Sequence, residues 1–344
     1  MNRWRMPAEW EPHERTWMAF PLANGTFGED GSASLVAAQV AWADVATTIA
    51  RYEPVTLIAG VDQGPVASAM AGPGVTVIER PLDDAWMRDI GPTFTLDEGT
   101  LGATDWIFNG WGAQVWAAWD HDARIAHDIA HDIGAELRPS TLTNEGGGIH
   151  VDGAGTVLLT ETVQLDPMRN PGWTREQVEA EVHAQLGTTH AIWLPRGLTR
   201  DYGEFGTRGH VDIVATFVHP GLVVAHSQLD PTHPDYEVTR EAIALLRAST
   251  DASGRSLEVV EVRAPTALMV EDDWSDFSYI NHYVGNGFVI VGTFDDPSDE
   301  GALELLSRLY PGRRIERANG RAIFSHGGGV HCITQQQPRS STAV

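Results

Sequence analysis

The chain has no lysine, so every cationic side chain other than histidine is an arginine. This absence excludes enzymes that bind pyridoxal phosphate through a lysine Schiff base, and nucleotide-binding loops built on a lysine. Cysteine occurs once, at Cys332, which excludes an internal disulfide and favours a reducing compartment. Apolar runs are shorter than the ~20 residues of a membrane span, and the N-terminus has no apolar signal segment. We therefore expect a cytoplasmic protein with no membrane partner.

Positive charge is scarce. The chain has 23 arginines and 47 acidic residues, so its formal net charge is -24. Proteins that bind nucleic acid are usually basic, so we expect no nucleic-acid partner. A negative field speeds the approach of a cationic substrate, although solubility alone is the simpler explanation for most of this charge. The composition is therefore compatible with a small cationic substrate without requiring one.

The 344 residues contain no linker or low-complexity stretch, which favours a single domain over 1–344. Residues 338–344 are expected to form a flexible tail. A strand, a helix and a second strand follow one another five times, over residues 54–80, 101–139, 156–194, 221–262 and 287–317. The helices of these units are expected at 62–71, 115–133, 174–186, 236–246 and 299–309. A further helix is expected at 34–50, with Ser34 as its N-cap.

A short strand that ends in a glycine turn precedes each unit after the first, at 93–96, 149–151, 213–218 and 279–284. A fifth such strand, at 330–334, would have to pair with the N-terminal unit and close a ring. A recurring unit, even at a loose period, is typical of repeat architectures. Equivalent positions in a ring meet at its axis. Polar or reactive groups just before or within these strands are therefore expected to converge: Asp89, Glu145, His210, Asp212, the 279–281 region and Cys332.

Three consecutive glycines, Gly327, Gly328 and Gly329, precede Cys332 by a few residues. Glycine permits backbone conformations closed to other residues and a close approach to a ligand. A cysteine near the end of such a turn is well placed to be an exposed nucleophile. The alternative is a small buried side chain without chemistry, which is the usual state of a lone cysteine.

Two carboxylates stand beside glycine-rich turns. Asp89 lies shortly before Gly91 and Pro92, which form a rigid turn. Its alternative role is to pair with an arginine or to cap that turn. Glu145 enters a second glycine triplet at 146–148. Two such triplets, each near an ionisable residue, favour a functional role, and the alternative is close packing of backbones at the centre of the ring.

His210 and Asp212 are two residues apart, and in a strand such side chains face the same way. A carboxylate beside a histidine tunes the pKa of the imidazole. One alternative is a satisfied core histidine. Another is a metal site, because His150 and Asp152 repeat the spacing. The chain lacks the dense Asp and His clusters of metal-dependent hydrolases that act on guanidines, so we expect no metal.

A set of motifs that spans nearly the whole chain closely resembles the agmatine deiminase family, within the bacterial peptidylarginine-deiminase-type guanidino-modifying enzymes. The motifs cover 7–13, 16–21, 86–92, 108–112, 145–153, 169–171, 193–195, 209–212, 278–281 and 327–338. The resemblance implies an α/β fold, the five-bladed pseudo-symmetric α/β propeller known as the pentein fold. It also implies a hydrolytic deiminase of a small cationic guanidino compound, with no cofactor. The first expectation is conversion of agmatine and water to N-carbamoylputrescine and ammonia, a step of polyamine metabolism.

The resemblance also implies roles for single residues. Cys332 is expected to be the nucleophile that forms a covalent thiouronium intermediate, and His210 the general acid and base. Asp89 and Asp212 are expected to hold the guanidinium, whose planar fork of donors matches carboxylates. Glu145 is expected to support His210 and the substrate. Further substrate contacts are expected at Trp86, Glu204 and Gly329.

The segment 200–209 departs from the family pattern, because it is longer than the usual acidic run and carries Arg208. An arginine there would suit a substrate with a carboxylate, unless Glu204 takes the acidic role and Arg208 pairs outward. His282 also stands where the family usually has phenylalanine. Arginine, a guanidino acid and peptidyl arginine therefore stay open as substrates. Amidino transfer, a non-catalytic pentein that binds the ribosome, and a homodimer also stay open.

Overall fold

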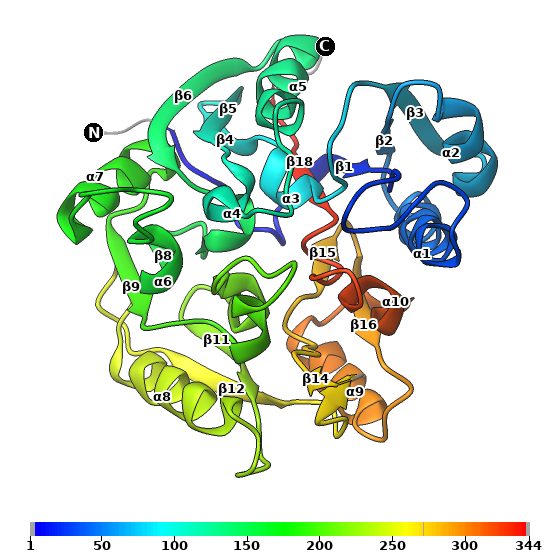
Figure 1. The fold of residues 1–344 in the computed structure, drawn as a ribbon. Coiled ribbons are helices and arrows are strands. Elements are labelled where there is room, and N and C mark those ends of the chain that lie inside the picture. Colours follow the sequence, from blue (N-terminus) through cyan, green and yellow to red (C-terminus); the bar gives the residue numbers. More distant parts are fainter. Residues whose placement is uncertain (1–3, 271, 342–344) are drawn as a thin grey trace.

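A computed structural model describes residues 4–270 and 272–341, which form five small mixed sheets around a common centre (Figure 1). In each sheet an entry strand pairs antiparallel with a second strand, and the second pairs parallel with a third. A parallel pair needs a crossover connection, which in this fold contains a helix. The predicted five-bladed α/β propeller is therefore confirmed.

The strands of each sheet follow one another in order from the entry strand. The first sheet contains β18 (Gln335–Pro338), β1 (His13–Ala19), β2 (Val55–Ala59) and β3 (Val75–Glu79). The second contains β4 (Thr93–Asp97), β5 (Thr100–Ile107) and β6 (Glu136–Thr143), and the third β7 (His150–Val151), β8 (Thr156–Thr160) and β9 (His190–Leu194). The fourth contains β10 (Ala215–His219), β11 (Leu222–Ser227) and β12 (Glu258–Arg263), and the fifth β15 (Tyr283–Gly285), β16 (Phe288–Thr293) and β17 (Arg314–Asn319). A separate hairpin joins β13 (Met269–Val270) to β14 (Asp273–Trp274).

The crossover helices lie toward the rim of the ring (Figure 1), and they are α1 (Ala33–Ile49), α5 (Ile125–Ile133), α7 (Arg175–Leu186), α8 (Asp235–Ala248) and α9 (Asp299–Leu309). The other helices are α2 (Gly64–Ala71), α3 (Met87–Ile90), α4 (Gly110–Ala113), α6 (Glu161–Gln164) and α10 (Gly320–Phe324). Four short 3-10 turns are η1 (Asp122–Arg124), η2 (Gly146–Gly148), η3 (Thr199–Tyr202) and η4 (Val211–Ile213). Across 4–270 and 272–341, no helix combines the length and the apolar character needed to cross a membrane.

Local sequence explains where a crossover helix begins and ends. Thr174 and Gln177 form a capping box at the start of α7, in which each side chain accepts a hydrogen bond from the other residue's backbone. Gly187 ends the helix with a φ of 71°, a conformation that costs glycine little. The prediction of a helix at 174–186 is therefore confirmed to within one residue.

The ring closes where β18 pairs antiparallel with β1, so the C-terminal strand pairs with the N-terminal unit as predicted. The expected strand at 330–334 was wrong in position, because β18 begins at Gln335. Residues 330–334 form a turn instead, in which the Thr334 hydroxyl donates to the carbonyl of Val330 at 3.0 Å. Pro338, which was expected to begin a flexible tail, instead lies in β18 and pairs with His13. Positions 342–344 lie outside the described residues.

The N-terminal unit differs from the prediction. Its strand–helix–strand core is β1, α1 and β2. The chain then continues through α2 into β3, which pairs with β2 at the edge of the sheet. The N-cap of α1 is Ser32 rather than Ser34, because the Ser32 hydroxyl accepts from the backbone N–H of Leu35 at 3.2 Å. The helix expected at 115–133 begins later, with η1 and α5. The rings of Trp116 and Trp111 stack with their centroids 5.2 Å apart, and this contact holds the segment before η1.

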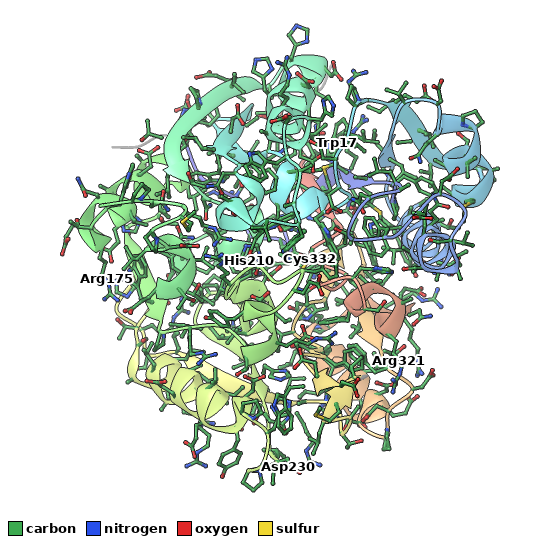
Figure 2. The ribbon with its side chains drawn as sticks, in the orientation of Figure 1. Trp17, Arg175, His210, Asp230, Arg321 and Cys332 are labelled. Carbon is green, nitrogen blue, oxygen red and sulfur yellow. The ribbon has the colours of Figure 1, made fainter. Side chains whose placement is uncertain are left out.

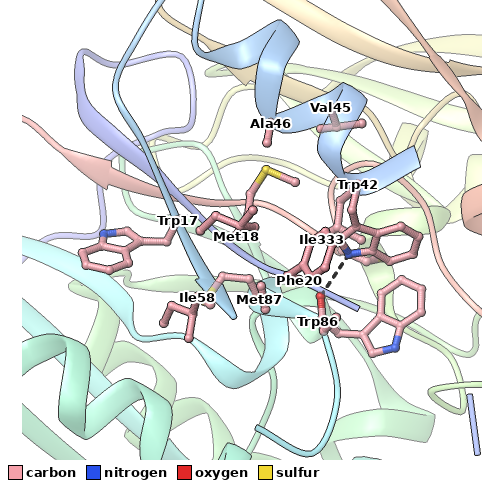
Figure 3. Packing of buried hydrophobic residues seen from close by; sticks show 14 of the residues in the cluster. Trp17, Met18, Phe20, Trp42, Val45, Ala46, Ile58, Trp86, Met87 and Ile333 are labelled. Carbon is pink, nitrogen blue, oxygen red and sulfur yellow. Dashed lines mark hydrogen bonds between the residues drawn. The ribbon is translucent and has the colours of Figure 1, made fainter. Parts of the chain in front are cut away.

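Aromatic packing in the first blade reaches the segments that carry polar groups. Trp42 of α1 meets Trp86 edge to face at 5.4 Å, and its Nε1 donates to the carbonyl of Ala85 at 3.3 Å (Figure 3). Met87 and Ile333, both fully buried, belong to the same core. They are sequence neighbours of Arg88 and Cys332. The core therefore fixes the backbone on two sides of the centre of the ring.

Candidate active site

The short segment before each entry strand carries a polar or reactive group. The groups are Asp89 in α3 before β4, Glu145 before η2 and β7, His210 and Asp212 at η4 before β10, Asn281 before β15, and Cys332 before β18. Each is at most 7% exposed. His210 and Cys332 lie near the centre of the ring in Figure 2, whereas Arg175, Asp230 and Arg321 lie toward its rim. The ring thus brings together groups that the sequence scatters over most of its length.

One expectation about this region was wrong, because His210 and Asp212 do not lie in a strand. Val211–Ile213 forms the 3-10 turn η4, and β10 starts only at Ala215. Asp201 holds this turn in place, since its carboxylate accepts from the backbone N–H groups of Gly209 at 2.7 Å and His210 at 3.1 Å. These hydrogen bonds to Asp201 therefore stabilise the backbone at Gly209 and His210 without pairing to a neighbouring strand.

The sulfur of Cys332 lies between an amide and a carboxylate. Asn281 Nδ2 donates to Sγ at 3.3 Å, and Asp212 Oδ2 lies 3.6 Å from it. A Cβ on Gly328 would lie 3.1 Å from Sγ and 2.7 Å from the ring of Trp86, so the triplet leaves the room the thiol needs. Burial and the charges of Asp212 and Asp89 raise the pKa of the Cys332 thiol well above its usual range. Burial and these two carboxylates therefore favour the neutral thiol.

The imidazole of His210 has one anchored and one free nitrogen. Nε2 lies 3.1 Å from Glu145 Oε2, whereas Nδ1 forms no hydrogen bond to any described residue and lies 3.9 Å from Asp89 Oδ1. Burial opposes protonation, but Asp89 and Glu145 outweigh it and raise the pKa of His210 to about 9. A Cβ on Gly147 would lie 2.5 Å from Nδ1, so the second triplet also serves close packing at the centre. The protonated ring can give a proton from Nδ1.

Glu145 is fixed by a buried arginine. Arg169 Nε donates to its two oxygens at 2.9 and 3.1 Å, and Arg169 Nη1 donates to Asp166 at 2.9 Å. Burial would raise the pKa of Glu145, but the charges of Arg169 and His210 lower it. The carboxylate therefore stays ionised and holds His210 in one orientation.

Asp89 and Asp212 face the thiol with different hydrogen-bond partners. Asp89 accepts from Trp111 Nε1 at 2.9 Å and from the backbone N–H of Gly147 at 3.0 Å. Burial raises the pKa of Asp89, and nearby carboxylates add to the effect. Asp212 Oδ2 contacts His331 Nδ1 at 2.7 Å, whereas Asp212 Oδ1 is buried with no hydrogen bond from any described residue. Burial opposes ionisation of Asp212, but His331 outweighs it and lowers the pKa.

The other three predicted substrate contacts are Trp86, Gly329 and Glu204, and they do not all lie at the thiol. Trp86 is buried beside Gly328, and a Cβ on Gly329 would lie 2.4 Å from Asn281 Oδ1, so both shape the wall around the thiol. Glu204 is exposed on the loop that follows η3, and no described contact joins it to the other predicted residues. The structure therefore brings together all the predicted site residues except Glu204.

Sequence reasoning assigned no role to several residues that touch these groups. Asn281, Trp111, Arg169, His331 and Glu9 all contact the predicted residues or one another. Each stands inside one of the motifs of the resemblance, but periodicity and spacing give no sign of what a side chain touches. Among the described residues, the group of Glu9, His150 and His331 has metal-type ligand atoms within 4.8 Å of one another. That group lies next to Asp212 rather than at the sulfur.

A neutral thiol, a protonated imidazole and two carboxylates around one buried point form a set with a definite chemistry. Asp212 Oδ1, which accepts no hydrogen bond from residues 4–270 or 272–341, and the nearby Asp89 suit a planar cation, because such a cation offers donors in a fork. A bound cation would offset the carboxylates that disfavour the thiolate of Cys332. The arrangement can therefore support nucleophilic attack of sulfur on the carbon of a bound cation, with His210 as proton donor.

Known proteins share this sequence and architecture over nearly the whole chain. The sequence profile of the Porphyromonas-type peptidyl-arginine deiminase family matches residues 5–338. A Streptomyces avermitilis protein named "Putative agmatine deiminase" is 61% identical, with 98% of this chain and 97% of that protein covered. The agmatine deiminase of Stutzerimonas stutzeri is 39% identical, with 97% and 95% covered. The solved agmatine deiminase of Enterococcus faecalis superposes with a TM-score of 0.91 at 33% identity, covering 98% of this chain and 96% of that one.

Proposed function

The chain belongs to the Porphyromonas-type peptidyl-arginine deiminase family, and we propose that it hydrolyses agmatine to N-carbamoylputrescine and ammonia. The observation that carries the proposal is the buried thiol of Cys332 beside Asp212, whose Oδ1 accepts no hydrogen bond from the described part of the chain. A guanidinium supplies both the charge and the planar donors that such a site needs. The relatives named agmatine deiminase support the choice of substrate.

In this mechanism Asp89 and Asp212 hold the guanidinium with its central carbon over the sulfur of Cys332. The substrate's charge offsets the two carboxylates, so the thiol releases its proton to solvent when the substrate binds. The thiolate bonds to the carbon, His210 gives the proton on Nδ1 to the departing nitrogen, and the C–N bond breaks to release ammonia. Water then attacks the thiouronium carbon, and His210 accepts one proton from it. The C–S bond breaks, and the second proton of the water goes to the departing sulfur, which restores the thiol and releases the ureido product.

Arg208 bears on the far end of the substrate. Its Nη1 lies 3.6 Å from Asp166 Oδ2, and its Nη2 donates to Gln114 Oε1 at 3.3 Å. The charge of Arg208 is thus paired with a carboxylate of the chain itself, which supports an amine-ended substrate over one that ends in a carboxylate. A contact between Glu204 and the substrate amine stays a prediction.

Ammonia release from agmatine, arginine, 4-guanidinobutyrate and a peptidyl arginine, each with product analysis, tests the proposal. We expect agmatine to have the highest kcat/KM and to give a ureido product. A Cys332→Ala protein that still released ammonia and ureido product would contradict the mechanism. A preference for 4-guanidinobutyrate would show that the pairing of Arg208 was misjudged, and transfer of the amidino group to an added amine would identify an amidinotransferase instead.

Three further expectations stay predictions. A single domain over 1–344 predicts one cooperative unfolding transition and no stable proteolytic fragment. A homodimer would appear as twice the chain mass in light scattering. A cytoplasmic location predicts recovery of the native protein in the cytosolic fraction of its own cells.

A further inference from the structure

A buried chain of ionisable groups, which the mechanism does not use, contacts Asp212. Glu9 Oε2 is 3.0 Å from His331 Nε2, and His331 Nδ1 is 2.7 Å from Asp212 Oδ2. Glu9 is 5% exposed and His331 2%. Asp212 Oδ2 in turn lies 3.6 Å from the sulfur of Cys332. Side-chain contacts thus connect Glu9, which precedes β1, through His331 and Asp212 to the thiol of Cys332.

The contacts require two protons on His331. Both ring nitrogens face carboxylate oxygens, and an ionised carboxylate can only accept, so both nitrogens must donate. Burial and the charge of Arg88 lower the pKa of His331, but Glu9 and Asp212 outweigh them and raise it. Burial raises the pKa of Glu9, but the charge of His331, with hydrogen bonds from His150 and His331, outweighs it and lowers that pKa well below its usual range. His331 is therefore an imidazolium between two carboxylates.

A metal ion is a competing occupant, because Glu9, His150 and His331 offer ligand atoms close together. The protons argue against it. The backbone N–H of Phe217 donates to His150 Nδ1 at 3.2 Å, so the ring proton sits on Nε2, the nitrogen that faces Glu9 at 3.7 Å. A metal would need a lone pair at that nitrogen. The neighbouring cavity holds only about 10 Å³, and the guanidinium of Arg88 lines it.

We propose that Glu9 and His331 are positioning residues that keep Asp212 ionised and oriented for the guanidinium. This inference rests on the proposed function. His331 occupies Oδ2 of Asp212, which leaves the buried Oδ1 as the acceptor for the substrate. A neutral His331 would still donate one hydrogen bond to Asp212, but it would supply no charge to offset burial. Asp212 would then take up a proton at higher pH and lose its attraction for a cation.

Other titratable or charged groups also face this line of contacts, and the replacement of Glu9 alters none of these side chains chemically. Those around His331, besides Glu9 and Asp212, are Arg88, His150 and His282. Those around Asp212, besides His331, are His210, Arg88, Asp89 and Cys332.

The variant Glu9→Gln tests the proposal with little change in shape. The backbone N–H of Val284 donates to Glu9 Oε1 at 2.7 Å, which orients the new amide with its NH₂ group toward His331. A donor then faces a donor, so His331 must give up the proton on Nε2. In the pH profile of kcat/KM for agmatine, we expect the acid limb to move up by about one pH unit. Below that limb, kcat/KM should fall roughly tenfold relative to wild type, mainly through a higher KM. The plateau at higher pH should change little.

Glu53→Gln is the matched control. Glu53 is also buried and lies 3.1 Å from a histidine, His13, but neither residue contacts Asp212. A merely structural role for Glu9 predicts the same outcome for both variants, namely a lower Tm and an unmoved acid limb. That outcome would overturn the proposal. Glu9→Asp keeps the charge and should restore much of the wild-type pH profile.

Nitrogen NMR on the histidine-labelled wild-type protein gives a second test, which does not depend on the Glu9 or Glu53 variants or on the substrate. We expect both ring nitrogens of His331, assigned with His331→Gln, to be protonated at pH 7.5. A neutral His331, or a stoichiometric metal ion retained through chelation, would overturn the proposal. If the labelled ring is an imidazolium but agmatine releases no ammonia, the proposed function fails and the buried charge arrangement stands.

Discussion

Replacing Gly147 by alanine tests whether the free nitrogen of His210 is where proton transfer takes place. The position is not among the residues with a positive φ, so alanine fits the backbone. Its Cβ would lie 2.5 Å from His210 Nδ1, whereas ordinary contacts begin at 3.4 Å, so the ring must retreat by about 0.9 Å. Asp89 Oδ1 also lies close to this Cβ position, at 3.0 Å.

A displacement of this size has a calculable cost. Misplacing a reacting group by about 1 Å lowers rates by roughly 100-fold, which corresponds to about 2.7 kcal/mol of barrier. Overpacking should also lower the free energy of unfolding by about 1–3 kcal/mol. We therefore expect Gly147→Ala to fold and to release ammonia from agmatine with a kcat/KM about 100-fold below wild type.

The assay compares ammonia release with thermal unfolding for Gly147→Ala and for a control, Gly301→Ala. Gly301 lies in α9, and a Cβ there meets nothing within 4 Å. The control should keep full activity and gain about 0.5–1 kcal/mol of stability. A Gly147→Ala protein with wild-type kcat/KM would refute the reasoning, because it would show that proton transfer does not depend on where His210 Nδ1 lies.

Three other perturbations follow from the buried groups. Glu145→Gln removes a carboxylate that raises the pKa of His210 to about 9, so the alkaline limb of kcat/KM should move to lower pH; an unmoved limb would assign it to another group. Asp276→Asn should stabilise the protein at pH 8, because burial raises the pKa of Asp276 to about 7, above its value in the unfolded chain. Ionisation therefore destabilises the native state as pH rises, and urea unfolding should show the advantage of the variant growing by up to about 1.4 kcal/mol per unit between about pH 4 and 7. Asp201→Asn turns one of the acceptors of the His210 turn into a donor, and we expect kcat to fall by at least ~10-fold; unchanged kcat would show that the turn holds without it.

The repeat could be read from the sequence because its signals are local. Apolar runs, capping residues and glycines act within a few residues of one another, and most predicted elements lie close to the observed ones. The prediction was wrong where distant contacts decide the backbone. Residues before Asp122 are held by the stacking of Trp116 on Trp111, and residues 330–334 turn because Asn281 accepts from the backbone of His331.

The candidate site was predicted in part. Reactive side chains beside glycine triplets, such as Cys332 and Glu145, stand out in a sequence because the glycines mark close packing. Their partners do not stand out. Arg169 looks like any arginine, and only its two hydrogen bonds to Glu145 reveal what it does.

By itself, the sequence determined five strand–helix–strand units, a ring and a single thiol at its centre, because hydrophobic periodicity and glycine placement are properties of neighbouring residues. Only the tertiary structure decided which nitrogen of His210 and which oxygen of Asp212 have no hydrogen-bond partner among the described residues, and where the protons sit. Protonation depends on burial and on charges that the fold brings near. Glu9 and His331 are 322 residues apart in the chain, and no local pattern connects them.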